Sequence, residues 1–122
     1  ERPCLTTITL HGDGRQTRSF CHGSDEVRGL VALLDSDYDQ PMNIGNPGEF
    51  TMRQLAELVV ELTGSSSPIV TVPLPPEREG DPAQRRPDIS LASSVLGWQP
   101  TVSLREGLTR MIAYFRDVEG IR

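Results

Sequence analysis

Arginines gather in one proline-rich loop of this sequence, between residues 74 and 98. Arg78, Arg85 and Arg86 lie within nine positions, and Asp81 lies between the first two. A planar guanidinium donates paired hydrogen bonds to a phosphate, and a carboxylate accepts hydrogen bonds from sugar hydroxyls. The loop therefore predicts a binding site for a phosphate or another anion. The alternative is a solvated charge cluster whose members pair with one another and stabilise little.

A fourth arginine, Arg18, is the second candidate for anion binding. It lies in the run GDGRQTRSF, in an extended stretch that leads into a predicted helix. At the edge of a sheet its guanidinium would meet a phosphate. The alternative is an exposed arginine on a hairpin.

Cysteine and histidine do not form a recognisable site. A zinc site from Cys4, His11, Cys21 and His22 is disfavoured because their spacing matches no familiar ligand pattern. A Cys–His nucleophile is disfavoured too, because adjacent residues on a strand point to opposite faces. We expect no metal site and free thiols at Cys4 and Cys21, with one disulfide as the alternative. No GxGxxG turn joins a strand to a helix, so a dinucleotide fingerprint is absent.

Composition limits the class of protein. The 122 residues suit one domain, and the ten prolines with a hydrophobic share of 36% indicate much loop. The net charge of −5 argues against a general binder of nucleic acid or anionic membranes. All twelve basic residues are arginine, which excludes lysine-dependent chemistry within this sequence. With no long apolar run and no signal-peptide pattern, we expect a cytoplasmic chain that does not enter a membrane.

Short strands and three main helices must position these arginines. Strands alternating with helices favour a small α/β or α+β layer. Extended segments are predicted at 5–10, 16–21, 42–44 and 69–72, and helices at about 25–35, from 52 to a stop at Gly64, and from Ser103 onward.

The predicted helices have recognisable ends and apolar stripes. Ser24 is the expected N-cap of the first helix, and Thr51 with Gln54 forms a capping box for the second. Asp88 is expected to cap a short helix that ends at Gly97, and Trp98 to pack that helix against the domain. Apolar side chains line one face of each main helix: Val27, Leu30, Val31 and Leu34 in the first, Met52, Leu55, Val59 and Leu62 in the second, and Leu104, Leu108, Met111, Ile112 and Phe115 in the third.

Five motifs of this sequence are familiar: GDGRQTRSF, SDEVRGLVALLDS, NIGNPGEFTMRQLAEL, DPAQRRPDISLASSVLGW and SLREGL. With them, the stretch from Leu10 to Phe115 resembles the C-terminal, substrate-binding part of extended short-chain dehydrogenase/reductases, within the NAD-dependent epimerase/dehydratase superfamily. Among these it is most similar to UDP-glucuronate decarboxylases (UDP-xylose synthases), with UDP-glucose 4-epimerases and dTDP-glucose 4,6-dehydratases as sister families.

The resemblance implies a substrate and roles for four residues. A decarboxylase of this kind uses tightly bound NAD to convert UDP-glucuronate to UDP-xylose through a 4-keto sugar. Arg18 matches the family's contact to the nucleotide diphosphate, and Arg85 matches a contact on the nucleotide side. Arg78 and Asp81 fall where the epimerases have an Arg-x-x-Asp pair that binds the same region, although decarboxylases usually lack that arginine.

Two departures limit what the resemblance implies. The family commonly has Tyr-Val where this sequence has His22-Gly23, which puts local packing and specificity in doubt. The Tyr-x-x-x-Lys catalytic pair is absent, because Tyr38 is followed by Met42 and Tyr114 by Val118 at that spacing. The Gly-rich turn of the Rossmann half is absent too.

We therefore expect residues 1–122 to be a nucleotide-sugar-binding lobe of a larger enzyme whose Rossmann half is missing here. The expected ligand is a UDP-sugar, with NAD held by the missing half and no catalytic or cofactor-binding residue in this chain. Apolar surface exposed by that absence should make the chain a homo-oligomer. The alternatives are the lobe of a sister epimerase or dehydratase, and a stand-alone, non-catalytic anion-binding module.

Overall fold

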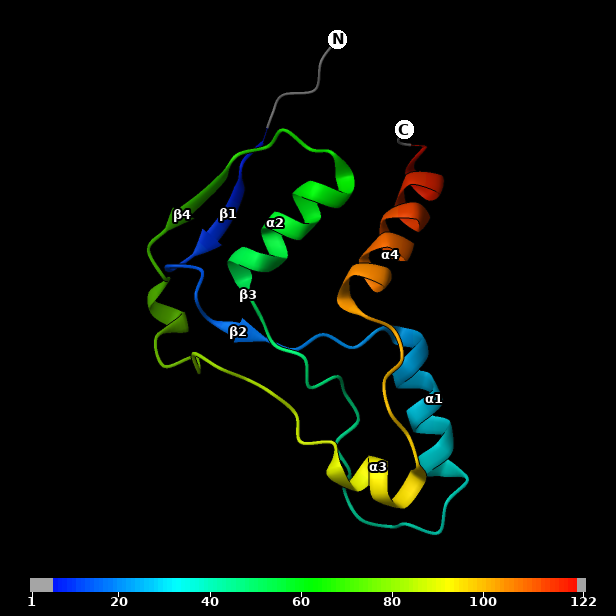
Figure 1. Ribbon diagram of the computed structural model, residues 1–122. Helices are drawn as coiled ribbons and strands as arrows, with labels where there is room; N and C mark the ends of the chain where they lie inside the picture. Colours follow the sequence, from blue (N-terminus) through cyan, green and yellow to red (C-terminus); the bar gives the residue numbers. More distant parts are fainter. Residues whose placement is uncertain (1–5, 121–122) are drawn as a thin grey trace.

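The computed structural model describes residues 6–120 and has the mixed α/β architecture that the sequence predicts. Figure 1 shows the strands with α2 and α4 at one end of the molecule and α1 with α3 at the other. The elements in chain order are β1 (Ile8–His11), β2 (Thr17–Arg18), α1 (Gly23–Leu34), β3 (Phe50–Thr51), α2 (Met52–Thr63), β4 (Ile69–Val72), the 3-10 turn η1 (Pro76–Arg78), α3 (Ser90–Leu96) and α4 (Leu104–Glu119).

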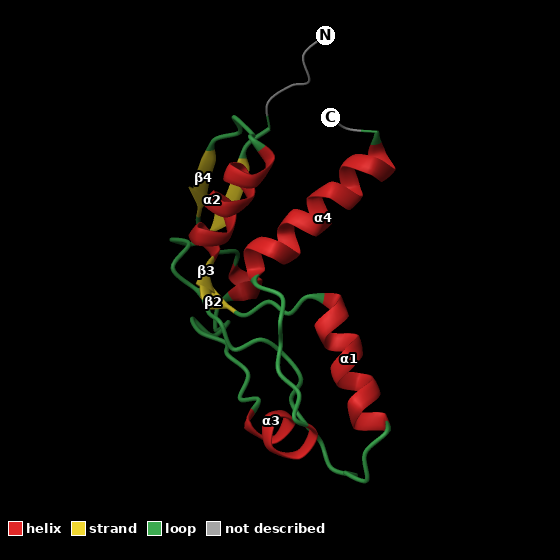
Figure 2. Ribbon diagram, turned by 45° about the vertical axis from the view of Figure 1, so that its right-hand side comes forward, coloured by secondary structure: helices red, strands yellow, loops and turns green. Residues whose placement is uncertain are grey.

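Two small sheets set the position of the arginine-bearing segments. β1 pairs with β4 in parallel, with Leu10 opposite Thr71. β2 pairs with β3 in antiparallel orientation, with Arg18 opposite Phe50. Helix α2 follows β3 directly and lies beside α4, as both ribbon views show (Figure 2). The chain therefore carries Arg18 on a short strand whose neighbour leads straight into a well-formed helix.

The predicted ends of α2 are confirmed. The Thr51 hydroxyl accepts from the Gln54 N–H, and the Gln54 side chain accepts from the Thr51 N–H, which completes the capping box. Gly64 ends the helix in the left-handed conformation at φ +68°, which glycine adopts without strain.

Ser24 as the N-cap of α1 is wrong. The helix begins at Gly23, and His22 occupies the N-cap position. His22 Nδ1 accepts the N–H of Ser24 at 3.2 Å, so an imidazole nitrogen satisfies one of the helix-end donors.

Residues 42–44 do not form the predicted strand, although β-branched and apolar types favour one there. Within residues 6–120 no strand lies beside them, and a strand needs a neighbour to form its ladder. The stretch 16–21 is likewise paired only at Thr17–Arg18. In contrast, the strand predicted at 69–72 is confirmed as β4. The strand predicted at 5–10 is observed as β1, at Ile8–His11. Residue 5, where the predicted segment begins, lies outside the described residues.

The core is small and sits around Trp98. Trp98 is 2% exposed, which confirms its predicted packing role. The expected inner face of α4 is only partly covered, because Met111 and Phe115 remain half-exposed. The apolar stripe of α1 faces solvent. In the part of the chain that the structure describes, the other buried apolar residues are Leu10, Ala56, Ala92 and Val102. Among the described residues, no helix combines the length and hydropathy needed to cross a membrane.

Candidate functional site

Arg18 connects two segments that are far apart in the sequence. Its Nη1 donates to the Thr17 carbonyl at 2.6 Å and to the Pro82 carbonyl at 3.0 Å. The Thr17 N–H donates to Ala83 O at 2.8 Å, so the arginine-rich loop is fastened to β2 by backbone as well as side chain. The sequence motif around Arg18 and the loop around Arg85 therefore form one site.

A shallow groove of about 620 Å³ opens between β2 and this loop. Ser19 Oγ donates to the Arg85 carbonyl at 3.4 Å and holds the two walls together. Three guanidinium groups line the groove and no carboxylate does, so it attracts anions. Within the described residues none of the three forms a salt bridge. The lining residues are Arg18, Ser19, Gln84, Arg85, Arg86 and Pro87.

Arg18 also lines a second, smaller hollow, of about 270 Å³. Arg78 and Asp81 lie there, with Arg78 Nε 3.1 Å from Asp81 Oδ2. His11 lines the same hollow, and its buried Nδ1 has no hydrogen-bond partner among the described atoms. The other three predicted residues therefore lie around Arg18, but they divide between two hollows, and Arg78 is already paired.

Asp88 lies beside the groove, and its prediction as the N-cap of α3 is wrong, because Ile89 occupies that position and Asp88 precedes it. Its Oδ1 accepts the Ser90 N–H at 2.9 Å and the Ser90 hydroxyl. The hydrogen bonds from the Ser90 hydroxyl and N–H, with the charge of Arg86, hold the pKa of Asp88 below its usual value. The carboxylate is thus occupied by the helix end.

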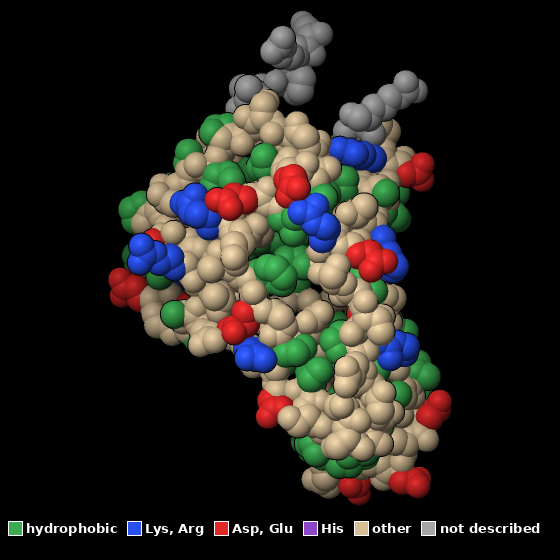
Figure 3. Space-filling model, viewed as in Figure 1, with side chains coloured by type: hydrophobic (Ala, Val, Ile, Leu, Met, Phe, Trp, Pro, Cys, Tyr) green, Lys and Arg blue, Asp and Glu red, His purple; other side chains and the backbone are tan. Residues whose placement is uncertain are grey.

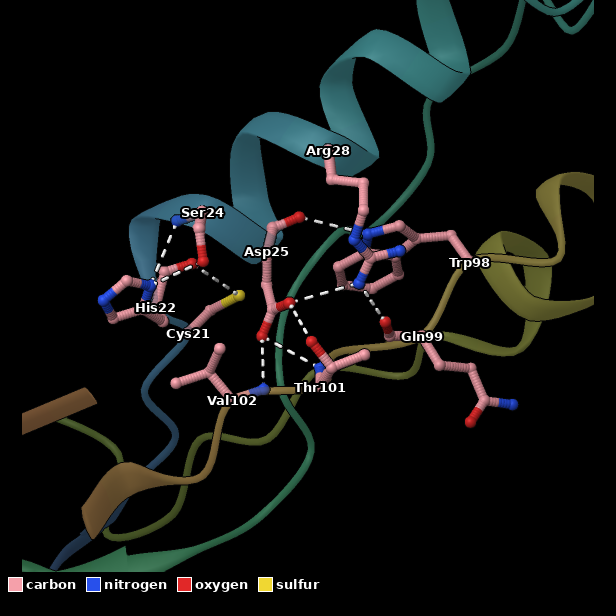
Figure 4. Close-up of polar contacts among 9 residues, drawn as sticks. All are labelled: Cys21, His22, Ser24, Asp25, Arg28, Trp98, Gln99, Thr101 and Val102. Atoms are coloured by element: carbon pink, nitrogen blue, oxygen red, sulfur yellow. Dashed lines mark hydrogen bonds and ion pairs between the residues drawn. The ribbon is translucent and has the colours of Figure 1, made fainter. Parts of the chain in front are cut away.

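Asp25 is a buried carboxylate that the sequence did not single out as a functional residue (Figure 4). It is 1% exposed and accepts from the Thr101 N–H at 3.0 Å, the Thr101 hydroxyl at 3.0 Å and the Val102 N–H at 2.9 Å. Arg28 Nη2 lies 3.1 Å from its Oδ1, and the Trp98 indole donates to its backbone carbonyl at 3.1 Å. The cluster fastens α1 to the segment between α3 and α4.

Asp25 has a structural role and not a catalytic one. Burial opposes its ionisation, but hydrogen bonds from the Val102 N–H, Arg28 and Thr101 outweigh burial and lower its pKa. A carboxylate that accepts so many hydrogen bonds stays ionised and is a poor general base at neutral pH. The signal that identifies it is its position in the RSF-x-x-x-x-D run, where the aspartate begins a helix beside a distant Trp98.

The surroundings of Cys21 disfavour the thiolate form that a nucleophile needs. Burial, a hydrogen bond with Glu26 and the charges of Glu26 and Asp25 raise the pKa of the Cys21 thiol to about 11. Cys21 is a free thiol, as predicted. Cys4 lies outside the described residues. In residues 6–120 no cluster of three His, Cys, Asp or Glu side chains is placed to hold a metal ion.

Comparison with known sequences finds one family and close relatives. A family model described as GDP-mannose 4,6 dehydratase matches residues 4–111. UDP-glucuronic acid decarboxylase 1 of Arabidopsis thaliana is 52% identical over 110 residues, which cover 90% of this chain and 25% of that protein. The chain therefore spans about a quarter of the length of this relative.

Solved structures agree on the fold. UDP-glucose 4-epimerase from Thermotoga maritima, solved with UDP-glucose, has a TM-score of 0.85 and 33% identity, covering 93% of this chain and 36% of that chain. UDP-glucuronic acid 4-epimerase from Bacillus cereus, in complex with UDP-glucuronic acid and NAD, has a TM-score of 0.80 and 32% identity, covering 92% of this chain and 36% of that chain.

Proposed function

The chain belongs to the GDP-mannose 4,6-dehydratase family, and from this premise we propose that it is the nucleotide-sugar-binding lobe of an NAD-dependent UDP-glucuronate decarboxylase. The proposed reaction converts UDP-glucuronate to UDP-xylose and carbon dioxide through a 4-keto sugar. The proposed domain is the whole of residues 1–122. A cytoplasmic location remains a prediction from the sequence.

The choice of decarboxylase rests on the difference in identity between two groups of relatives. Several plant and vertebrate UDP-glucuronic acid decarboxylases are 46% to 53% identical to this chain. The solved epimerases with the same fold are 33% identical or less. This difference supports a decarboxylase over the sister epimerases, and UDP-glucuronate is bound by the Bacillus cereus epimerase as well.

The open groove is the observation that supports nucleotide binding by this chain's own residues. Arg18 and Arg85 line it without a carboxylate partner, and we assign them to the diphosphate of the nucleotide. Arg78 and Asp81, on the other side of Arg18, are assigned to the adjoining part of the nucleotide. Holding the diphosphate fixes the orientation of the sugar while its chemistry proceeds, which is a contribution to rate through positioning.

The residues present do not fit NAD. After β1 the turn at residues 11–14 leads to β2, where a dinucleotide site needs a glycine-rich turn between a strand and the N-terminus of a helix. NAD supplies the hydride transfer of this reaction class, so in the proposed enzyme it is held outside this chain. For the same reason we assign no catalytic residue here.

Titration with UDP, UDP-glucuronate and NAD tests the proposal. We expect the chain to bind UDP, Arg85→Ala to weaken that binding about tenfold or more, since a hydrogen bond to a charged group contributes about 1.5–3 kcal/mol, and NAD not to bind. Arg110→Ala is the matched control, because Arg110 is exposed on α4 and paired with Glu106. Calorimetry and the chemical shifts of groove residues measure ligand binding by the wild type and by both variants. Equal affinities of the wild type and Arg85→Ala, or no shifts at millimolar UDP, would contradict the assignment.

We also infer that the isolated chain self-associates. Large apolar side chains on α1 and α4 are more than half exposed, and contiguous apolar surface of this kind finds partners. Figure 3 shows further hydrophobic side chains near the middle of one face, where the two ends of the molecule meet. Light scattering across a wide concentration range tests this inference, and a strictly monomeric mass throughout would contradict it.

A further inference from the structure

His22 joins the beginning of α1 to the first turn of α4. Its Nδ1 accepts the Ser24 N–H at 3.2 Å and lies 2.7 Å from the Ser24 hydroxyl oxygen (Figure 4). Its carbonyl accepts the N–H groups of Asp25 at 3.0 Å and Glu26 at 3.1 Å, which start the helix. On the other side the imidazole lies against α4, where a β-carbon placed on Gly107 would be 3.2 Å from His22 Cδ2. One half-buried side chain therefore caps one helix and packs against another.

The hydrogen bond from the Ser24 N–H requires an unprotonated Nδ1. A neutral imidazole has one acceptor nitrogen, whereas an imidazolium has two donors and no acceptor. A protonated Nδ1 can still donate to the Ser24 hydroxyl, but it leaves the Ser24 N–H without this acceptor. It also places a positive charge at the helix N-terminus, where the helix dipole is itself positive. The protonated ring is therefore the poorer cap, and histidine is the side chain whose charge ordinarily changes between pH 5 and 8.

Two carboxylates of α1 adjoin the ring, and neither replaces the lost acceptor. The carboxylate of Asp25 already accepts from Arg28 and from the segment between α3 and α4. Glu26 is the other acidic residue of the first turn, and it lies four positions from His22 in the sequence. Its attraction for an imidazolium therefore acts in the unfolded chain as well, and it adds little to the difference between the folded and unfolded states.

The remaining charged groups near the ring are paired or uncharged. Cys21 precedes His22, and burial raises the pKa of its thiol to about 11, so it carries no charge in mild acid. On the side of α4 the ring meets Gly107, which has no side chain. The ion pairs of this part of α4 are Arg110 with Glu106, and Arg105 with Glu61 of α2.

We propose that His22 is a pH-sensitive cap, which holds α1 against α4 while its imidazole is neutral and loosens this junction when the ring is protonated. Protonation removes the acceptor of the Ser24 N–H, and the charged ring is also less suited to lie half-buried against Gly107. The pH range differs from that of Asp25, whose contribution changes only as the pH falls through its ordinary pKa of 3.8. The inference does not depend on which ligand the groove binds.

Urea unfolding near pH 8 and near pH 5.5, followed by Trp98 fluorescence, tests the proposal. Between these two conditions the folding equilibrium constant of the wild type should fall about fivefold more than that of His22→Asn, the effect of losing one N-cap hydrogen bond. His22→Asn is the matched control, because an asparagine amide caps a helix and does not titrate. His22→Ala should be about fivefold less stable than the wild type near pH 8 and should show the weak pH dependence of His22→Asn. Any contribution of His11, the other histidine, is common to all three chains.

A titration of the wild type followed by NMR needs no variant. The nitrogen chemical shift of the Ser24 amide and the ring shifts of His22 should change with the same midpoint, because the ring nitrogen is the acceptor of that amide. A Ser24 amide that does not follow the His22 ring would overturn the proposal. Equal pH dependence of the wild type and His22→Asn would do the same. So would a wild type that gains stability in mild acid relative to His22→Asn, because Glu26 would then bind the charged ring more strongly than the cap binds the neutral one.

Discussion

The Asp25 cluster and the Arg18–Arg85 groove hold charged side chains in opposite ways. Asp25 is buried and accepts hydrogen bonds from two backbone N–H groups, a hydroxyl and a guanidinium. In the groove, by contrast, Arg85 is exposed and the lining contains no carboxylate. A charge whose bonding capacity is used inside the fold stabilises that fold. A charge left open at the surface is available to a ligand, and the predictions below test this division.

The largest expected effect is loss of stability on removing the buried carboxylate. Asp25→Ala should lower the free energy of unfolding by about 3–5 kcal/mol, because it leaves buried donors unsatisfied and Arg28 without its partner. Trp98 is the only tryptophan of the chain and lies in this cluster, so its fluorescence during urea unfolding reports the change. A loss below about 1 kcal/mol would be no larger than that of an exposed ion pair. It would contradict the proposed difference between the Asp25 cluster and the Arg18–Arg85 groove.

Acid should reproduce part of this loss. The pKa of Asp25 is lower in the fold than its ordinary value of 3.8, so the unfolded chain takes up a proton first as the pH falls. The contribution is complete above the ordinary value and is lost progressively as the pH falls through it toward the folded-state pKa. Unfolding free energies at pH 7, 5, 4 and 3 measure the slope.

The control for that slope is Asp25→Asn. Its stability should depend less steeply on pH between 5 and 3 than that of the wild type, because residue 25 no longer titrates. Parallel curves would show that other carboxylates, such as Asp88, cause the acid loss.

The sequence predicted local features better than those that need a partner. The capping box at Thr51, the glycine stop at Gly64 and the buried Trp98 depend on neighbouring residues or on one large side chain, and all three are confirmed. The strand at 42–44 was wrong because a ladder requires a second strand that residue types cannot supply. The N-cap of α1 was wrong because ring nitrogens are rarely considered as cap acceptors, yet His22 serves.

For the candidate site, too, local features were predicted and contacts between distant residues were not. The clustering of Arg78, Arg85 and Asp81 was visible in the sequence, Arg18 was a separate candidate from its place in an extended stretch, and the resemblance to a family assigned all four to one ligand. Neither the sequence nor the resemblance indicated that Arg18 fastens the loop through Pro82, or that Arg78 is already paired. Those facts depend on contacts between residues 64 positions apart and on the path of the loop, which spacing alone does not determine.

The smallest expected effect concerns Arg78, and it sharpens the comparison within the site. Arg78 forms an exposed ion pair with Asp81, and such a pair contributes about 0–1 kcal/mol, so Arg78→Ala should change unfolding stability by less than that. It should also weaken UDP binding only about threefold, against the larger loss for Arg85→Ala, because Asp81 competes for its guanidinium. Titration of both variants under identical salt measures the ratio. A loss for Arg78→Ala that equals or exceeds the loss for Arg85→Ala would show that the ligand displaces Asp81, and pairing in the free chain would then not predict which guanidinium binds.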